Sequence, residues 1–108
     1  MKILAVVVLV PVFGLGSGTA GAADASAGKT KSAACAACHG IDGNSAAPDF
    51  PRLAGQYQDY LVKSLLDYKS GARKNPIMAP MAAPLSTKDM EDIAAFYASQ
   101  KGLVVKHD

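Results

Sequence analysis

Apolar residues recur with helical spacing in two segments of the chain. Over residues 56–70 they fall on one face of a helix. The members of this stripe are Tyr57, Leu61, Leu65 and Tyr68. Gly71 follows as a stop signal. The spacing therefore predicts a helix over 56–70.

The second segment begins at Ser86, an N-cap candidate with Asp89 three residues later in an approximate capping box. Lys101 suits the negative end of a helix, and Gly102 supplies the exit. The predicted inward stripe contains Met90, Ile93, Phe96 and Tyr97. This is the most strongly signalled helix of the chain.

A third helix is predicted over residues 25–37, capped by Ser26 and ended by Gly40. No window alternates in the way that a strand requires, so the fold class is all-α. Two stretches rich in Gly, Pro and Asn, 40–55 and 71–84, separate the helices. Loops of this length in a small domain are usually functional or disordered.

The first residues have the layout of a secretory signal. Lys2 precedes an apolar stretch over 3–15, and small residues follow around Ala22. A membrane anchor is the alternative, but the continuous apolar run is shorter than the roughly 20 residues of a spanning helix. We predict a cleaved signal peptide over 1–23, export to the periplasm, and one domain over 24–108 without a membrane span.

Composition narrows the function further. The formal charge is +2, which falls to +1 without Lys2, and no basic run points to nucleic acid or a lipid surface. The remaining domain of about 85 residues has no tryptophan. Domains of this size rarely fold without a disulfide, a metal or a large cofactor.

The two cysteines provide the candidate. Cys35, Cys38 and His39 form the C-x-x-C-H pattern of haem attachment. Residues three apart on a helix point to nearly the same side. Both thiols can therefore add to the two vinyl groups of one haem, and His39 can ligate its iron.

Three other interpretations compete with haem. A Cys35–Cys38 disulfide suits an oxidising compartment but closes a tiny loop. A thioredoxin-like redox pair needs a βαβ context that the pattern lacks. A zinc site needs four ligands, and only His107 is available besides Cys35, Cys38 and His39.

A six-coordinate haem iron needs a second axial ligand, and a methionine sulfur is the usual partner of histidine in cytochromes c. The proline-rich loop 71–84 offers Met78 and Met81. Met90 lies inside the last predicted helix and is assigned to the core.

The chain resembles class I c-type cytochromes, above all the small periplasmic c553/c554 carriers and single domains of cytochrome c4. The resemblance rests on "CAACHGIDGNSAAPDFPRLAGQ", "NPIMAPMA" and "LSTKDMEDIAAFYASQ". It implies three main helices and two long loops around one haem c, bound covalently through Cys35 and Cys38.

The resemblance also implies roles for individual residues. Met78, seven residues before Leu85, takes the place of the second iron ligand, so the metal ligands are His39 and Met78. The carbonyl of Pro48 is expected to accept the proton on the outer nitrogen of His39, which would orient the ring.

Arg52 and Arg73 are expected to contact the haem propionates, since a guanidinium suits a carboxylate. Asn75 is a further candidate to bond a propionate or the methionine sulfur. Gly28 corresponds to the small residue at which the first and last helices cross, with Phe96 or Tyr97 over it. His107 is expected to be exposed and without a role.

The predicted function is one-electron transfer between redox partner proteins, without enzymatic activity, by a chain that is a monomer. One rival is a relay subunit bound tightly to a dehydrogenase or oxidase. Another is a ligand-binding haem protein with an open iron site. Four surface lysines are candidates to steer an acidic partner: Lys63, Lys69, Lys74 and Lys88.

Overall fold

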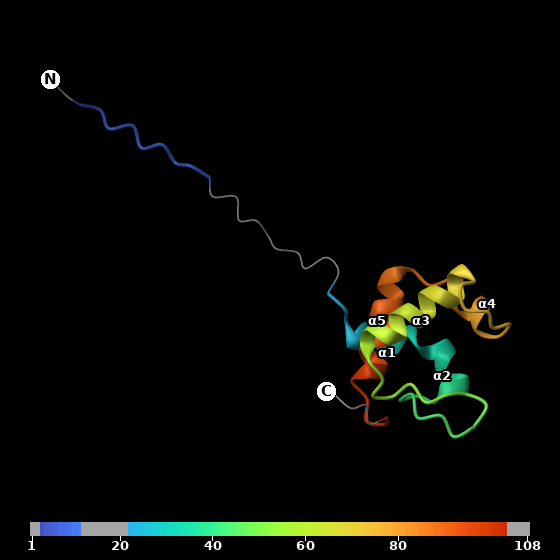
Figure 1. Cartoon of the computed structure of the whole chain (residues 1–108). Helices are drawn as coiled ribbons and strands as arrows, with labels where there is room; N and C mark the ends of the chain where they lie inside the picture. Colours follow the sequence, from blue (N-terminus) through green and yellow to red (C-terminus); the bar gives the residue numbers. More distant parts are fainter. Residues whose placement is uncertain (1–2, 12–21, 104–108) are drawn as a thin grey trace, which may run out of the picture.

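All secondary structure in the described part of the chain is helical. The computed structural model describes residues 3–11 and 22–103. Its helices are α1 (Ala25–Lys31), α2 (Ala33–His39), α3 (Gln58–Ser70), α4 (Met78–Ala82) and α5 (Thr87–Ala98). Figure 1 shows these helices gathered at one end, with residues 3–11 extended away from them. The predicted all-α class is confirmed.

The N-terminal segment contributes no helix where it is described. Residues 3–11 are exposed and have no regular structure, and the rest of the predicted signal up to residue 21 lies outside the described residues. Within the described ranges, no helix is both long enough and apolar enough to cross a bilayer. The signal peptide itself stays a prediction.

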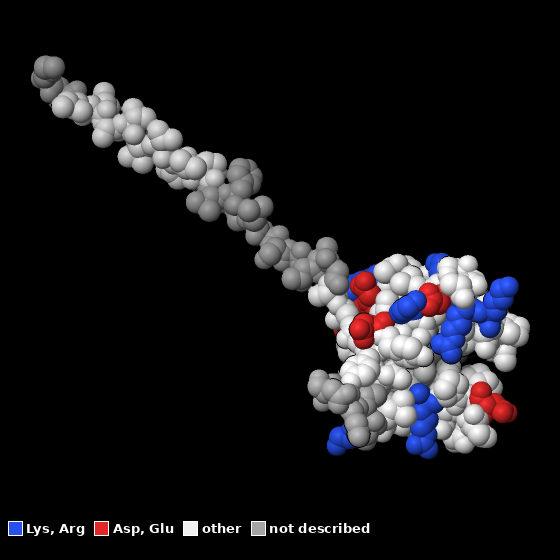
Figure 2. Space-filling model, viewed as in Figure 1, with Lys and Arg blue, Asp and Glu red and all other residues white. Residues whose placement is uncertain are grey.

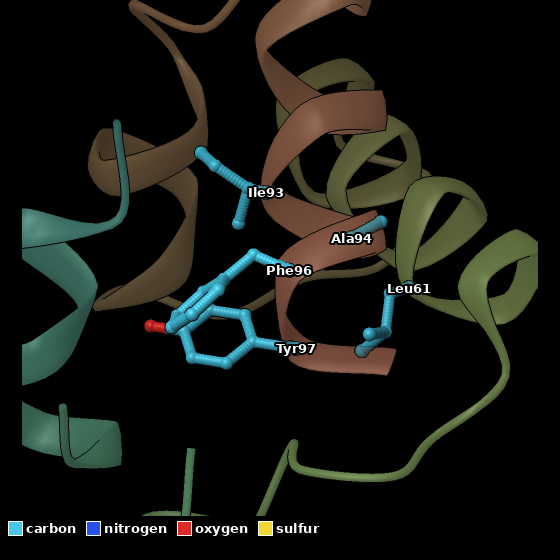
Figure 3. Close-up of a cluster of buried hydrophobic side chains, with 5 residues drawn as sticks. All are labelled: Leu61, Ile93, Ala94, Phe96 and Tyr97. Carbon is cyan, nitrogen blue, oxygen red and sulfur yellow. The ribbon is translucent and has the colours of Figure 1, made fainter. Parts of the chain in front are cut away.

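Helix α5 is the centre of the packing, because it contacts both α1 and α3. Its buried side chains meet Leu61 of α3 in one cluster, drawn in Figure 3. The buried cluster consists of Leu61, Ile93, Ala94, Phe96 and Tyr97. Met90 is fully buried as well. The predicted inward stripe of this helix is therefore confirmed.

Local chemistry explains how α5 starts. The Ser86 hydroxyl accepts from the Asp89 backbone N–H at 3.0 Å, and the Asp89 carboxylate accepts from the Ser86 N–H at 3.0 Å. Both bonds of the predicted capping box are present. The helix ends at Ala98, ahead of Lys101 and Gly102.

The first predicted helix is wrong in two details. It is divided at Ser32, whose hydroxyl donates to the Lys29 carbonyl at 2.8 Å and so favours a turn there. Its cap is Asp24 and not Ser26, because the Asp24 carboxylate accepts from the Ser26 and Ala27 N–H groups. Because the helix is divided, the two cysteines lie on a separate helix, α2.

Helices α1 and α5 cross closely at Gly28, as predicted. A Cβ atom on Gly28 would lie 1.8 Å from the Asp92 carbonyl oxygen, so only glycine fits. The three atoms nearest to such a Cβ are backbone atoms of Asp92 and Ile93, and the expected aromatic ring over Gly28 stays a prediction.

A buried carboxylate joins the same two helices. Asp92 is 1 % exposed and accepts from Lys31 at 2.7 Å, Lys88 at 2.6 Å and the Asp24 N–H at 2.9 Å. The hydrogen bonds from Lys31 and Lys88 hold the pKa of Asp92 well below its usual range. Nothing in the local sequence pattern indicated this ion-pair network.

Candidate functional site

A largely apolar cavity of about 410 Å³ opens beside the buried cluster. One side is lined by Cys35, Cys38 and His39 from α2. Met78 and Met81 of α4 also line it, together with residues of α3 and α5. The cavity therefore brings together the thiols, the imidazole and both loop methionines that the sequence singled out. Its volume is in the range of sites for organic ligands.

A second, larger groove of about 780 Å³ lies along α3 and is much more open to solvent. None of its lining residues is Cys, His or Met. It therefore lacks the thiols and the imidazole that covalent haem attachment requires, and the smaller cavity is the candidate site.

Both cysteines are half-buried free thiols on α2. Burial is the main cause that raises the pKa of the Cys35 thiol; the nearby Tyr97 hydroxyl opposes this shift, and the neighbouring Cys38 adds to it. Cys35 is therefore a neutral thiol at neutral pH, with an apolar environment that suits a carbon–sulfur bond.

The rival uses of the cysteines gain no support. No strand occurs in residues 3–11 or 22–103, so the context of a thioredoxin-like pair is missing there. Over the same ranges, no three His, Cys, Asp or Glu side chains converge on a metal position. His107, the fourth donor considered for zinc, lies outside the described residues.

His39 is 7 % exposed, and its ring is oriented by a backbone carbonyl. Its Nδ1 lies 2.8 Å from the Pro51 carbonyl oxygen. Because a carbonyl only accepts, Nδ1 carries the proton and Nε2 keeps its lone pair for a metal. The edge of the Phe50 ring, 6.4 Å away between centroids, packs against the imidazole.

The assignment of this role to Pro48 is wrong. Pro48 is exposed and sits inside a turn in which the Phe50 N–H donates to the Ala47 carbonyl at 3.2 Å. Proline is favoured at the second position of such turns. The turn carries the chain past Pro48, so that the carbonyl three residues later reaches His39.

The two methionines differ in how firmly the chain holds them. The Asn75 side-chain oxygen accepts from the Ile77 and Met78 N–H groups at 2.9 Å each. It thereby fixes the backbone at Met78, the first residue of α4. Met81 lies one turn later and is 38 % exposed. Helix α4 was not predicted, because Pro80 lies within its five residues and Pro76 and Pro84 flank it.

Arg52 and Arg73 both line the cavity and are exposed. The Arg73 guanidinium stacks on the Tyr68 ring, 4.8 Å from its centroid. Among the described residues neither arginine forms an ion pair. Two cationic groups are thus present at the cavity, and their contact with propionates stays a prediction.

Of the four surface lysines proposed to steer a partner, two are engaged in ion pairs. Lys63 pairs with Asp67 at 2.7 Å and Lys88 with Asp92. Lys69 donates to the Leu85 carbonyl. Figure 2 shows basic side chains in separate groups on the visible face, with acidic ones between some of them. Three of the four lysines thus have partners within the chain, and the steering role stays a prediction.

Tyr97 is a cavity residue that the sequence analysis assigned only to the core. The signal that was overlooked is its hydroxyl, since a buried tyrosine normally requires a hydrogen-bond partner.

Two adjacent thiols, an oriented imidazole and a thioether around one apolar cavity define a helical protein that binds a metal macrocycle covalently. Comparison with known sequences agrees with this class. The chain belongs to the cytochrome c family, whose pattern, described as cytochrome c, matches residues 25–101.

Individual relatives cover about three quarters of the chain. Cytochrome c4 of Stutzerimonas stutzeri is 53% identical over 92 residues, which are 77% of this chain and 44% of that protein. Cytochrome c-554(548) of Halomonas halodenitrificans is 48% identical over 83 residues, 74% of this chain and 100% of that protein.

A solved structure agrees in fold. The crystal structure of reduced recombinant cytochrome c4 from Pseudomonas stutzeri matches with a TM-score of 0.72 and 52% identity, over 81% of this chain and 50% of that one. The chain thus spans about half the length of the cytochrome c4 relatives. The class I cytochrome c fold is confirmed.

The family implies a covalently bound haem c with iron, and the residues fit this group. The C-x-x-C-H motif supplies two sulfurs and an imidazole whose free nitrogen is Nε2. Apolar walls from Leu61, Ile93 and Ala94 line the same cavity. These residues would hold the macrocycle, and a loop methionine would complete the coordination of its iron.

Proposed function

We propose that this chain is an exported one-electron carrier with a single haem c. Cys35 and Cys38 would bind it through thioethers, and His39 and Met78 would ligate its iron. The observation that carries the proposal is one cavity lined by all four side chains. One haem is proposed because the sequence contains only two cysteines.

The bound haem would supply an iron that alternates between its ferrous and ferric states. The chain's own residues favour that exchange by staying fixed. Pro51 holds the His39 ring, and Asn75 holds the backbone of Met78. Fixed ligands limit rearrangement between redox states, and an apolar pocket with a methionine ligand raises the potential.

Two axial protein ligands leave no open position for a substrate, which argues for a carrier and against an enzyme. Export to the periplasm is proposed from the predicted signal peptide and is in keeping with the cytochrome c4 relatives. Redox proteins of that compartment would be the partners. We further propose that the chain acts as a monomer.

The proposal is tested on the exported, full-length product. Its mass should exceed that of the polypeptide by one haem, and a pyridine haemochrome spectrum should be that of haem c. A product with no added mass overturns the proposal. Carbon monoxide binding to the native ferrous protein at neutral pH would favour the open-site rival, and stable co-purification with an oxidoreductase would favour the relay subunit.

The choice between the methionines is tested by Met78→Ala and Met81→Ala. We expect the first to abolish the weak absorption band of iron–sulfur charge transfer and the second to keep it. Two observations support this choice: Asn75 anchors the backbone of Met78, and Met81 is 38 % exposed. The opposite pattern would move the ligand to Met81.

A further inference from the structure

The hydroxyl of Tyr97 is a buried polar group with no role in the proposed function. Tyr97 is 1 % exposed, and within the described part of the chain its oxygen has no hydrogen-bond partner. Such groups are rare in folded proteins and call for an explanation. The ring is held firmly, with the Phe96 ring centroid 5.1 Å away.

The sulfur of Cys35 acts on this hydroxyl. Figure 3 shows the oxygen pointing away from α5 toward the ribbon of the N-terminal helices. Cys35 packs against the cluster that contains Tyr97, and both residues line the cavity. Ser32 is the other polar group that acts on the hydroxyl. Ser32 does not line the cavity, and its own hydroxyl donates to the Lys29 carbonyl.

The hydroxyl of Tyr97 is protonated at neutral pH. Burial, followed by the neighbouring Cys35, raises the pKa of Tyr97 to about 12. Tyr97 is therefore a hydrogen-bond donor at neutral pH. The thioether that would replace the thiol of Cys35 offers only lone pairs, so a donor is the complementary group.

We propose that the Tyr97 hydroxyl donates a hydrogen bond to the Cys35 sulfur once that sulfur carries the haem, and that this bond raises the reduction potential. The inference rests on the proposed function. The O–H dipole would present its positive end to the edge of the macrocycle in a pocket of low polarity. It would therefore stabilise the reduced state, which has one more negative charge. Tyr97 is thus a positioning residue that tunes the cofactor.

The test is Tyr97→Phe in the haem-loaded, full-length chain. We expect a lower midpoint potential. At a fixed solution potential, the ferric-to-ferrous ratio should rise about threefold. This change is smaller than the full energy of a hydrogen bond would produce. The iron–sulfur charge-transfer band should be unchanged, which separates tuning from loss of a ligand. An unshifted potential overturns the inference.

Two control variants locate the effect. Tyr60→Phe removes a hydroxyl from a residue that lines the same cavity but is 49% exposed, and it should leave the potential unchanged. Ser32→Ala should also leave it unchanged. If Ser32→Ala reproduces the shift of Tyr97→Phe, the hydroxyl serves Ser32 and the inference is wrong.

A measurement on the wild-type protein covers the case in which Tyr97→Phe does not load haem. Deuterium exchange of a hydroxyl bonded to sulfur should shift the carbon–sulfur stretching band in the resonance Raman spectrum. Identical bands in H₂O and D₂O overturn the inference. A wild-type product without haem would instead overturn the proposed function, so the two failures are distinguishable.

Discussion

The two sides of α5 differ in what completes them. Toward α1, the polypeptide is sufficient by itself, since Gly28 meets the backbone of Asp92 and two lysines neutralise the Asp92 carboxylate. Toward α2 and α4, apolar side chains surround a cavity of about 410 Å³. Residues of the chain complete the packing on the first side, whereas the packing on the second side requires a cofactor.

This difference explains how so small a domain can be stable. The α1–α5 contact provides a scaffold, but the cluster around Leu61 and Tyr97 has one face directed at the cavity. A large apolar group bound there would supply the missing half of the core. Predictions that remove the cofactor should therefore have larger effects than those that weaken the scaffold.

The largest effect is expected from Cys35→Ala combined with Cys38→Ala. Without covalent haem the cavity side should lose its packing, and most of the helical circular dichroism signal should be lost with it. The matched control is Ser26→Ala, which alters an exposed hydroxyl outside the cavity lining and should keep haem and helicity. A doubly substituted chain with the native spectrum would show that both sides are complete without the cofactor.

The next effect tests the scaffold side at Gly28. Gly28→Ala places a Cβ 1.8 Å from the Asp92 carbonyl oxygen, so α1 and α5 must separate. We expect the free energy of unfolding of the haem-loaded protein to fall by about 3 kcal/mol.

Gly71→Ala is the control for Gly28→Ala. Its Cβ would meet nothing within 4 Å, and only the left-handed backbone, φ 83°, opposes the change. The expected loss is about 1 kcal/mol. Denaturant unfolding with haem attached measures both values. Equal losses would mean that the helix crossing is not closely packed.

The sequence predicted the local features on both sides of α5. The capping box at Ser86 and the C-x-x-C-H motif are short patterns whose chemistry is complete within a few residues. The role of Gly28 was inferred from the resemblance, and the close crossing of α1 and α5 at this residue is confirmed.

The features that were missed depend on contacts between distant segments. Asp92 looked like one of several acids at the start of a helix, and its partner Lys31 is 61 residues away. Which carbonyl orients His39 depends on the path of the loop through 47–50. The turn there places the carbonyl of Pro51, and not that of Pro48, beside the imidazole. The role of the Tyr97 hydroxyl also depends on which helix lies opposite.

A smaller, pH-dependent effect belongs to the Asp92 ion pairs. The pKa of this carboxyl is lowered in the folded protein, chiefly by the hydrogen bond from Lys31. Its stabilisation is therefore fully present above the unfolded pKa of about 3.9 and is lost as the pH falls toward the lower folded pKa. We expect the free energy of unfolding to decrease below about pH 4.

Asp92→Asn should be less stable at neutral pH and should show a weaker decrease on acidification. The control is Glu91→Gln, because Glu91 makes no ion pair among the described residues. Unfolding by denaturant between pH 2 and 7 provides the comparison. An Asp92→Asn curve parallel to that of the wild type would assign the acid sensitivity to other carboxyl groups.

The smallest effect on stability is expected at Asn75 on the cavity side of α5. Asn75 accepts two backbone N–H groups at the start of α4, so it positions Met78 whether or not the sulfur is bound. Asn75→Ala should cost about 1 kcal/mol, the usual value of a lost helix cap. Asn75→Asp keeps the accepting oxygen and should recover most of this stability.

The spectrum of the same pair of variants separates capping from coordination. If Asn75 only caps α4, the iron–sulfur band should weaken in Asn75→Ala and return in Asn75→Asp, in parallel with stability. If its amide N–H₂ instead bonds the methionine sulfur or a propionate, Asn75→Asp should fail to restore the band, because a carboxylate has no proton to donate. Since both amide N–H groups of Asn75 are free of the two cap bonds, this pair of substitutions decides how far the polypeptide alone preorganises the second ligand.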